Sequence, residues 1–161
     1  MRQEELDFVE RAPRKWVFEE EVAAPPEAVF AAISADPSTW NGWFPGLSTG
    51  GYDGDGPHGV GSKRWVKMSG VTYRETMLAW DPPSRWAYRV DKSSAPIADA
   101  LVEDWVIEPR GEGRSVVRWT FAIDPRALFK VGAPAAGTVM GRLFKKAMAN
   151  LSEELSRRPQ A

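Results

Sequence analysis

Three polar residues near one tight turn are the best candidates for chemistry in this sequence. Arg64 precedes the dipeptide Ser69-Gly70, and Tyr73 and Glu75 follow it. If Ser69-Gly70 is a two-residue hairpin turn, Arg64 lies directly across from Glu75, on the same face as Tyr73. Arg64 would then polarise a carbonyl group while Glu75 or Tyr73 moves a proton. Burial would raise the pKa of Glu75, whereas the nearby guanidinium would lower it, so the two roles partly conflict.

The pairing of Arg64 with Glu75 has three open interpretations. It is an ion pair at a wet end of the sheet, a polar contact for the oxygen atoms of a ligand, or the product of a misassigned register. Burying an unpaired charge costs several kcal/mol, so such groups persist inside a protein only when they are paired, hydrated or functional. Glu103 is a further acidic candidate for the same face.

Composition excludes most other chemistry. The chain has 161 residues, no cysteine and one histidine, which removes thiolate catalysis, disulfides and thiolate metal sites and makes a histidine-built metal site improbable. The formal charge is -1 and the basic residues are scattered, so we expect no nucleic-acid partner. We also expect no metal and no cofactor.

Three short motifs resemble known sites but lack the required context. Residues 46–50 fit G-x-S-x-G, yet no helix follows and the only histidine, His58, lies in a loop. Residues 54–59 fit G-x-G-x-x-G, but no helix follows to hold a pyrophosphate. Asp53-x-Asp55 would need glutamate at the twelfth position of a calcium loop, where Arg64 stands. We interpret all three as turns.

The elements that position these residues follow from periodicity and turn signals. Residues 15–22 alternate as a strand, Pro25-Pro26 starts a helix, and Asp36-Pro37 starts a second short helix that ends within WNGWFPG, residues 40–46. From residue 47 to about 123 the pattern predicts six strands, with turns at residues 52–61, 69–70, 81–84, 93–96 and 110–113. From about Ala133 an amphipathic helix follows. The sheet must bury one face, and this helix is the only element long enough to cover it.

Turn lengths predict which side chains face that helix. The turn at residues 81–84 sets Ala79 against Trp86 and Met77 against Tyr88. A short turn at residues 110–113 brings two further apolar sets to the same side, which are Leu101, Glu103, Trp105 and Ile107, and Val117, Trp119, Phe121 and Ile123. Asp104 and Arg118 are then expected on the outer face as a cross-strand pair, with Trp65 and Trp80 also on that face.

Several segments in combination resemble one known superfamily. They are VAAPPEAVFAAISADPSTWNGWFPG, GVGSKR, GVTYRETMLAWDPPSRWAYRV and VIEPRGEGRSVVRWTF followed by a terminal helix. Over residues 15–156 the chain is similar to the START-like (SRPBCC, helix-grip) superfamily, in particular its polyketide cyclase/dehydrase and lipid-transport branch. The resemblance implies an α+β helix-grip fold, in which a curved antiparallel seven-stranded sheet wraps around a long C-terminal helix, with two short helices between strands 1 and 2. We expect residues 1–14 to form a flexible N-terminal arm and residues 15–161 a single START-like domain.

The same resemblance implies a deep apolar cavity with a mouth near the two short helices. WNGWFPG would then be a lid at that mouth, or its rings simply plug the end of the core. Met140, Phe144 and Met148 on the terminal helix are ordinary core or a deformable ligand wall. The candidate ligand-binding residues are Trp40, Trp43, Phe44, Arg64, Val66, Tyr73, Glu75, Met77, Trp86, Tyr88, Glu103, Trp105, Trp119, Met140, Phe144 and Met148.

Three functions stay open at this point. The first is binding, transport or sequestration of a small hydrophobic molecule such as a lipid or an aromatic polyketide. The second is a polyketide cyclase, aromatase or dehydratase that uses the same pocket, with Arg64, Glu75 and Tyr73 as candidates. The third is a non-enzymatic protein-interaction module that uses the aromatic mouth or Trp65 and Trp80. We expect a cytoplasmic protein without a transmembrane segment, either monomer or homodimer.

Overall fold

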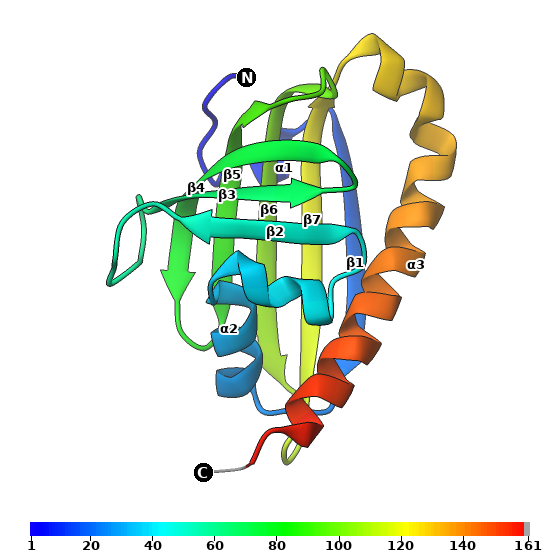
Figure 1. The fold of residues 1–161 in the computed structure, drawn as a ribbon. Coiled ribbons are helices and arrows are strands. Elements are labelled where there is room, and N and C mark those ends of the chain that lie inside the picture. The colour runs from blue at the N-terminus through cyan, green and yellow to red at the C-terminus, as the bar shows by residue number, and fades with distance from the viewer. Residues whose placement is uncertain (160–161) are drawn as a thin grey trace.

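The structure is a computed structural model that describes residues 1–159 and, among them, all side chains except those of Leu128 and Ala133. The elements in chain order are α1 (Phe8–Arg11), β1 (Arg14–Val22), α2 (Pro26–Ser34), the 3-10 helix η1 (Pro37–Gly42), β2 (Leu47–Tyr52), β3 (Lys63–Met68), β4 (Val71–Asp81), β5 (Arg85–Ser93), β6 (Ala98–Pro109), β7 (Ser115–Pro125) and α3 (Ala127–Arg157). Figure 1 shows this order along the chain.

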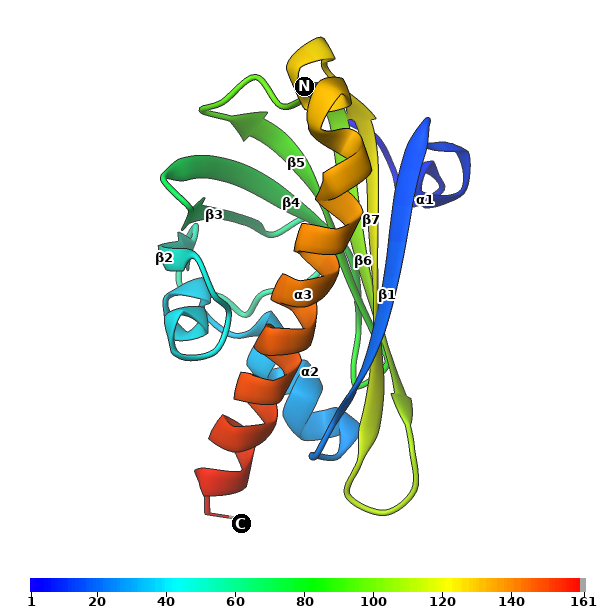
Figure 2. The ribbon, with the colours of Figure 1, turned by 90° about the vertical axis from the view of Figure 1, so that its right-hand side faces the viewer.

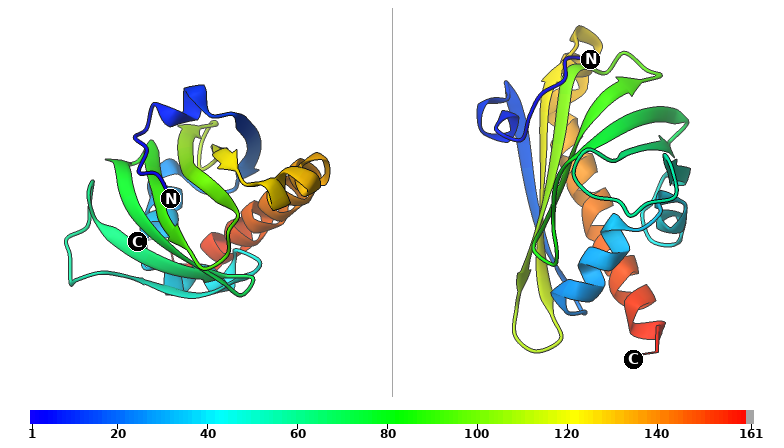
Figure 3. Two further views of the ribbon diagram at one scale, coloured as in Figure 1. Left: turned by 90° about the horizontal axis from the view of Figure 1, so that it is seen from above. Right: turned by 90° about the vertical axis from the view of Figure 1, so that its left-hand side faces the viewer.

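One curved sheet and one long helix make up the fold. The seven strands are antiparallel in the order β1-β7-β6-β5-β4-β3-β2. The sheet bends strongly, and α3 runs along its open side while α2 and η1 cover the lower end of the same side (Figures 1 and 2). The view from above shows the curvature, with α3 beside β1 (Figure 3). The predicted α+β helix-grip architecture, with two short helices between strands 1 and 2, is confirmed.

Local sequence explains where the short helices begin. Pro26 stands in the first turn of α2, where a backbone N–H would have no hydrogen-bond partner within the helix, so proline is tolerated there. Val29 and Ile33 of the same helix are buried on the inner side. Asp36 caps η1, because its carboxylate accepts a hydrogen bond from the backbone N–H of Ser38 at 2.9 Å. Trp40, on η1, is buried.

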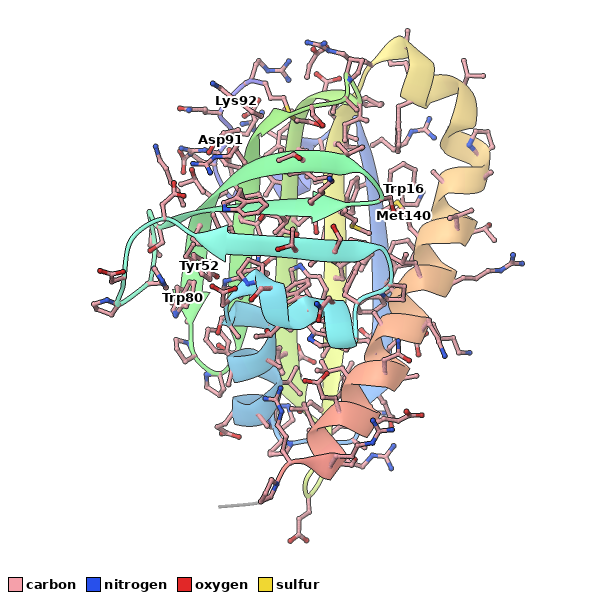
Figure 4. All side chains as sticks on the ribbon, viewed as in Figure 1. Trp16, Tyr52, Trp80, Asp91, Lys92 and Met140 are labelled. Carbon is pink, nitrogen blue, oxygen red and sulfur yellow. The ribbon has the colours of Figure 1, made fainter. Side chains whose placement is uncertain are left out.

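Glycines let α3 approach the edge strand β1. A Cβ on Gly137 would lie 2.7 Å from Nε1 of Trp16, and a Cβ on Gly141 would lie 3.2 Å from the ring of Phe18. Trp16 and Met140 lie where the helix faces the strand (Figure 4). Although α3 is long, none of the helices within residues 1–159 has both the length and the apolar character needed to cross a membrane.

Most of the predicted register is confirmed. Arg64 pairs with Glu75, Val66 with Tyr73 and Met77 with Tyr88. In the last hairpin, Leu101 pairs with Ile123, Glu103 with Phe121, Trp105 with Trp119 and Ile107 with Val117.

Two details of the predicted register are wrong. The pairing of β4 with β5 shifts between Met77 and Ala79, so Trp86 pairs with Trp80 rather than with Ala79. This irregularity turns Trp80 away from the expected outer face, and its ring packs 6.2 Å from that of Phe30 and 6.1 Å from that of Tyr52 (Figure 4).

The expected pair of Asp104 with Arg118 is also absent from the described residues. Asp104 instead accepts two hydrogen bonds from Arg85, at 3.0 and 2.9 Å. Arg118 lies opposite Val106 and donates to Glu19 at 3.1 Å, across the neighbouring edge of β7. Asp104 is therefore paired with Arg85 on β5, and Arg118 is paired with Glu19 on β1.

Residues of the N-terminal arm contact the outer face of the sheet. Phe8 and Val9 of α1 are buried against a small apolar cluster on the outer face, formed by Ala100, Val102 and Ala122. The backbone N–H of Arg2 donates to the carbonyl of Asp99, near the start of β6. The side chain of Arg2 donates to Asp124, near the end of β7. Figure 3 shows the arm and α1 on the side of the sheet opposite α3.

Candidate functional site: an apolar cavity with a buried polar cluster

A cavity of about 430 Å³ lies between the concave face of the sheet and the first half of α3. Its aromatic lining consists of Trp40, Phe44, Tyr73, Tyr88, Trp105, Trp119, Phe121 and Phe129. Its charged lining consists of Arg64, Glu75 and Glu103. On α3 the lining is made of small and aliphatic side chains, which are Gly132, Ala135, Ala136, Val139, Met140 and Leu143. The cavity is therefore mostly apolar, with one group of charged side chains.

Most of the residues predicted from sequence line this cavity. They are Trp40, Phe44, Arg64, Val66, Tyr73, Glu75, Tyr88, Glu103, Trp105, Trp119 and Met140. The others, Trp43, Met77, Trp86, Phe144 and Met148, are buried in the surrounding core and do not line it. Of the terminal-helix stripe, Met140 thus borders the cavity, while Phe144 and Met148 are core.

The lining residues that sequence reasoning missed include two informative groups. Val90, Leu101 and Phe121 lie on the inner face of the sheet, and the alternation of the predicted strands could have identified them as lining residues. The first half of α3, from Phe129 to Ala136, precedes or only begins the predicted helix. Its glycine, alanine and proline residues carry no amphipathic pattern, so no sequence signal placed it at a cavity.

The aromatic segment WNGWFPG closes one end of the cavity. Trp40, Trp43 and Phe44 are all buried, and the Trp40 ring lies 4.6 Å from that of Trp43 and 5.9 Å from that of Trp86. The exposed part of the lining is elsewhere, on α3, where Val139 keeps 61% of its surface exposed. The mouth therefore lies beside the first half of α3 and not near the short helices, and these rings form an end wall.

Arg64 and Glu75 form a fully buried ion pair. Nε of Arg64 donates to Oε2 of Glu75 at 2.5 Å, and both residues are at most 3% exposed, which excludes a pair at a wet end of the sheet. The guanidinium also lies over the rings of Trp86 and Tyr88, at 4.6 and 4.8 Å. Burial raises the pKa of Glu75 above its ordinary value, and the charge of Arg64 limits that rise.

Glu103 is the second acid of the cavity and has no cationic partner among the described residues. Its Oε2 accepts hydrogen bonds from the Tyr88 hydroxyl at 2.6 Å and from Nε1 of Trp119 at 2.8 Å. Burial raises the pKa of Glu103 to about 7, against the opposing effect of the Tyr88 hydrogen bond. Strand pairing explains the geometry, because Tyr88 lies directly opposite Glu103 on β5 and Trp119 lies on β7.

The other oxygen of Glu103 is open to the cavity. Within residues 1–159 no donor contacts Oε1. Oε1 is nevertheless not enclosed by protein. The enclosed side-chain atoms that lack a partner among the described residues are Trp40 Nε1, Arg64 Nη1, Trp86 Nε1 and Trp105 Nε1. Glu103 also keeps part of its surface accessible although it lies deep in the protein, and it lines the cavity. That accessible surface therefore faces the cavity.

Comparisons with known proteins agree with this architecture. The family model described as polyketide cyclase / dehydrase and lipid transport matches residues 14–156. An uncharacterised protein of Mycobacterium tuberculosis is 30% identical over 118 residues, which are 73% of this chain and 70% of that protein.

Solved structures show the same fold. A START superfamily protein from Mycobacterium smegmatis has a TM-score of 0.70 at 12% identity, covering 89% of this chain and 97% of that one. The Zhui aromatase/cyclase from a Streptomyces species has a TM-score of 0.69 at 20% identity, covering 92% and 96%. The match to the family model over nearly the whole chain, together with the curved sheet around a terminal helix, shows that this chain belongs to the polyketide cyclase / dehydrase and lipid transport family.

Proposed function

We propose that this protein binds a small hydrophobic molecule in the cavity between the sheet and α3. The observation that carries the proposal is a mostly apolar cavity of about 430 Å³ that contains a few charged and hydroxyl groups. Its volume falls within the range of about 300–1,000 Å³ that is usual for ligand sites. Apolar walls supply binding free energy, and the small number of polar groups orients the ligand.

The structure of α3 supports access to this cavity. The helix is anchored on β1 near Gly137 and Gly141, whereas the turns that precede this anchor present Gly132, Ala135 and Ala136 toward the cavity. These small side chains leave room between helix and sheet. Val139, which is both exposed and part of the lining, marks the boundary between cavity and solvent. A ligand would enter along this side of the helix.

A blocking substitution at the mouth tests the proposal. Ala136→Trp places a large ring in the cavity, whereas Thr138→Trp adds the same ring at an exposed position of α3 outside the lining. Nile red fluorescence is expected to rise saturably with wild type and Thr138→Trp, and to stay low with Ala136→Trp. Mass spectrometry of small molecules that copurify with wild type but not with Ala136→Trp would identify the natural ligand. Equal dye binding by all three proteins would contradict a site in this cavity.

A second candidate function is proton transfer on the bound molecule. The raised pKa of Glu103 and its position in the cavity lining favour this function. An acid or base works best when its pKa lies near the working pH, and burial raises the pKa of Glu103 to about 7. The open Oε1 would take a proton from a carbon next to a ligand carbonyl and return it. Glu103 fits this role better than Glu75, because the Arg64 guanidinium pairs with Glu75 and opposes the rise of its pKa.

Deuterium exchange tests this second function without knowledge of the natural substrate. In D₂O, 2-acetylnaphthalene would lose its methyl proton signal as the protein removes a proton and returns a deuteron. Exchange is expected to be faster with wild type than with Glu103→Gln, while Glu75→Gln keeps most of the rate. Equal rates for wild type and Glu103→Gln would remove Glu103 as the proton carrier.

A further inference from the structure

The charged groups in the cavity do not balance. Arg64 is the one cationic side chain among the described residues that line it, and Glu75 already neutralises its charge at 2.5 Å. Glu103 adds a second carboxyl group without a cationic partner. When Glu103 is ionised, the lining therefore carries a net charge of about -1, in a space where low dielectric strengthens every charge interaction.

The hydrogen-bonding capacity of Glu103 is also unbalanced. Oε2 already accepts from Tyr88 and Trp119, whereas Oε1 has no donor within the described residues and faces the cavity. An ionised carboxylate can only accept hydrogen bonds. The polar group that a ligand brings to Oε1 must therefore be a donor, such as a hydroxyl or an ammonium group.

The surroundings of Glu103 favour the same kind of ligand. Trp105 stacks on Trp119 with ring centroids 5.5 Å apart, and Phe121 lies 5.8 Å from Trp119, so the faces and edges of aromatic rings lie close to the acid. Aromatic faces attract cations and tolerate neutral groups. A ligand carboxylate would instead bring a further negative charge near Glu75 and Glu103 without a free cation to pair with.

We propose that the cavity selects apolar molecules that carry a hydrogen-bond donor, an alcohol or a protonated amine, which binds Oε1 of Glu103, and that it rejects carboxylic acids of the same shape. This inference rests on the proposed binding function and names the ligand chemistry of that site. It also assigns to Glu103 the role of specificity determinant. The charge of Arg64, the residue that a search for an acid-binding site would choose, is already neutralised by Glu75, and its unpartnered Nη1 is enclosed in the protein.

The selectivity should depend on pH through Glu103. The groups that face it are Tyr88 on β5, Tyr73 and Glu75 on β4, and Arg64 on β3, and the described lining of α3 contributes no titratable side chain. Glu75 and Arg64 are held as a pair, and burial raises the pKa of both tyrosines. Near neutral pH, Glu103 is thus the group of this set that changes charge, and its protonation removes the repulsion of acids.

Four matched probes test the selectivity at pH 8. They are 2-naphthalenemethanol, 2-naphthylmethylamine, 2-naphthoic acid and 2-methylnaphthalene, each measured by displacement of Nile red. The alcohol and the amine are expected to bind at least about tenfold more tightly than the acid. In Glu103→Gln this ratio should fall toward one, while Glu108→Gln, an exposed change on the same strand, should keep the wild-type ratio. At pH 5.5 the ratio of the affinity for the alcohol to the affinity for the acid should be smaller in wild type than at pH 8.

Each outcome of this experiment is decisive. Binding of 2-naphthoic acid as tight as that of the alcohol at pH 8 would overturn the selectivity but leave the binding function standing. An unchanged ratio in Glu103→Gln would overturn the role of Glu103. If that variant does not fold, an unchanged ratio in wild type between pH 8 and pH 5.5 has the same meaning. Failure of Nile red and all four probes to bind would overturn both the selectivity and the proposed function.

Discussion

Trp119 donates a hydrogen bond from its indole nitrogen to Oε2 of Glu103 at 2.8 Å, inside the cavity rather than at the protein surface. The Tyr88 hydroxyl donates to the same oxygen. Both hydrogen bonds stabilise the ionised acid, yet burial outweighs them, because the pKa of Glu103 rises to about 7. The protein therefore keeps a carboxyl group in a place where its charge is unfavourable, which is typical of functional positions.

The stability of the fold should depend on pH through Glu103. Its pKa is about 7 in the folded chain and near the ordinary value of 4.5 when unfolded. The folded state thus binds the proton more tightly, so the contribution of Glu103 is complete below pH 4.5 and is lost as the pH rises to 7. Glu103→Gln removes this loss. Relative to wild type, the variant should gain about 2 to 3 kcal/mol in free energy of unfolding between pH 5 and pH 8.

Urea denaturation of both proteins at pH 5, 6, 7 and 8 measures this difference. The carboxamide keeps one acceptor for Tyr88 and Trp119, so the hydrogen bonds are retained in part. Glu108→Gln on the exposed end of β6 is the control and should follow wild type at every pH. Parallel pH curves for wild type and Glu103→Gln would show that the acid keeps its ordinary pKa in the folded state.

The buried pair of Arg64 and Glu75 should be costly to break and much less costly to replace as a whole. Arg64→Met leaves the Glu75 carboxylate buried without its cation, and loss of one partner of a buried pair typically costs about 3–5 kcal/mol. Adding Glu75→Gln removes the remaining charge and should recover part of that loss. The interaction follows from chemical denaturation of the two single variants and the double variant. The same cycle on the exposed pair Arg157 and Glu153 should give less than about 0.5 kcal/mol. Additive losses for the buried pair would show that the two residues do not stabilise one another.

Strand parity and turn chemistry made much of this site predictable from sequence. Ser69-Gly70 fixed the pairing of Arg64 with Glu75, and the parity of β6 placed Glu103 on the inner face. The sequence did not predict the hydrogen-bond partners of Arg64, Glu75 and Glu103 within the cavity in full. Both acids line the cavity, but rotamers and the neighbouring strand β5 decide that Glu75 is paired with Arg64 while Glu103 has no cationic partner among the described residues.

Other features had no usable sequence signal. The irregularity after Met77 turns Trp80 inward, and nothing in the alternation of β4 marks it. The first half of α3 is rich in small residues, so its place at the cavity mouth follows from the packing of Gly137 against Trp16 farther along the helix. Phe8 and Val9 are two apolar residues in a charged arm, too few to form a periodic pattern.

Phe8 should hold the N-terminal arm on the sheet. The ring is 1% exposed, and its removal leaves α1 with little apolar area against Ala100 and Ala122. Phe8→Ala should therefore detach the arm and lower the free energy of unfolding by up to about 3 kcal/mol. Trypsin cleavage after Arg11 and Arg14, followed by mass spectrometry, should become much faster. Glu10→Ala, an exposed change in the same helix, is the control. Equal cleavage rates for Phe8→Ala and wild type would show that the arm is not held by this residue.

Two glycines of α3 should respond in opposite ways to alanine. Alanine favours a helix over glycine by about 1 kcal/mol, and a Cβ on Gly132 meets no atom within 4 Å, so Gly132→Ala should stabilise the protein by that amount. A Cβ on Gly137 would lie 2.7 Å from Nε1 of Trp16, whose ring packs against Phe121 and Phe129. Overpacking of about 1–3 kcal/mol should exceed the gain in helix propensity, so Gly137→Ala should be destabilising. It should also weaken Nile red binding, because α3 must move from β1 and disturb the cavity walls. Thermal unfolding and dye titration of the two variants measure both effects. A stabilised Gly137→Ala with unchanged dye affinity would show that the close contact between α3 and β1 does not position the cavity.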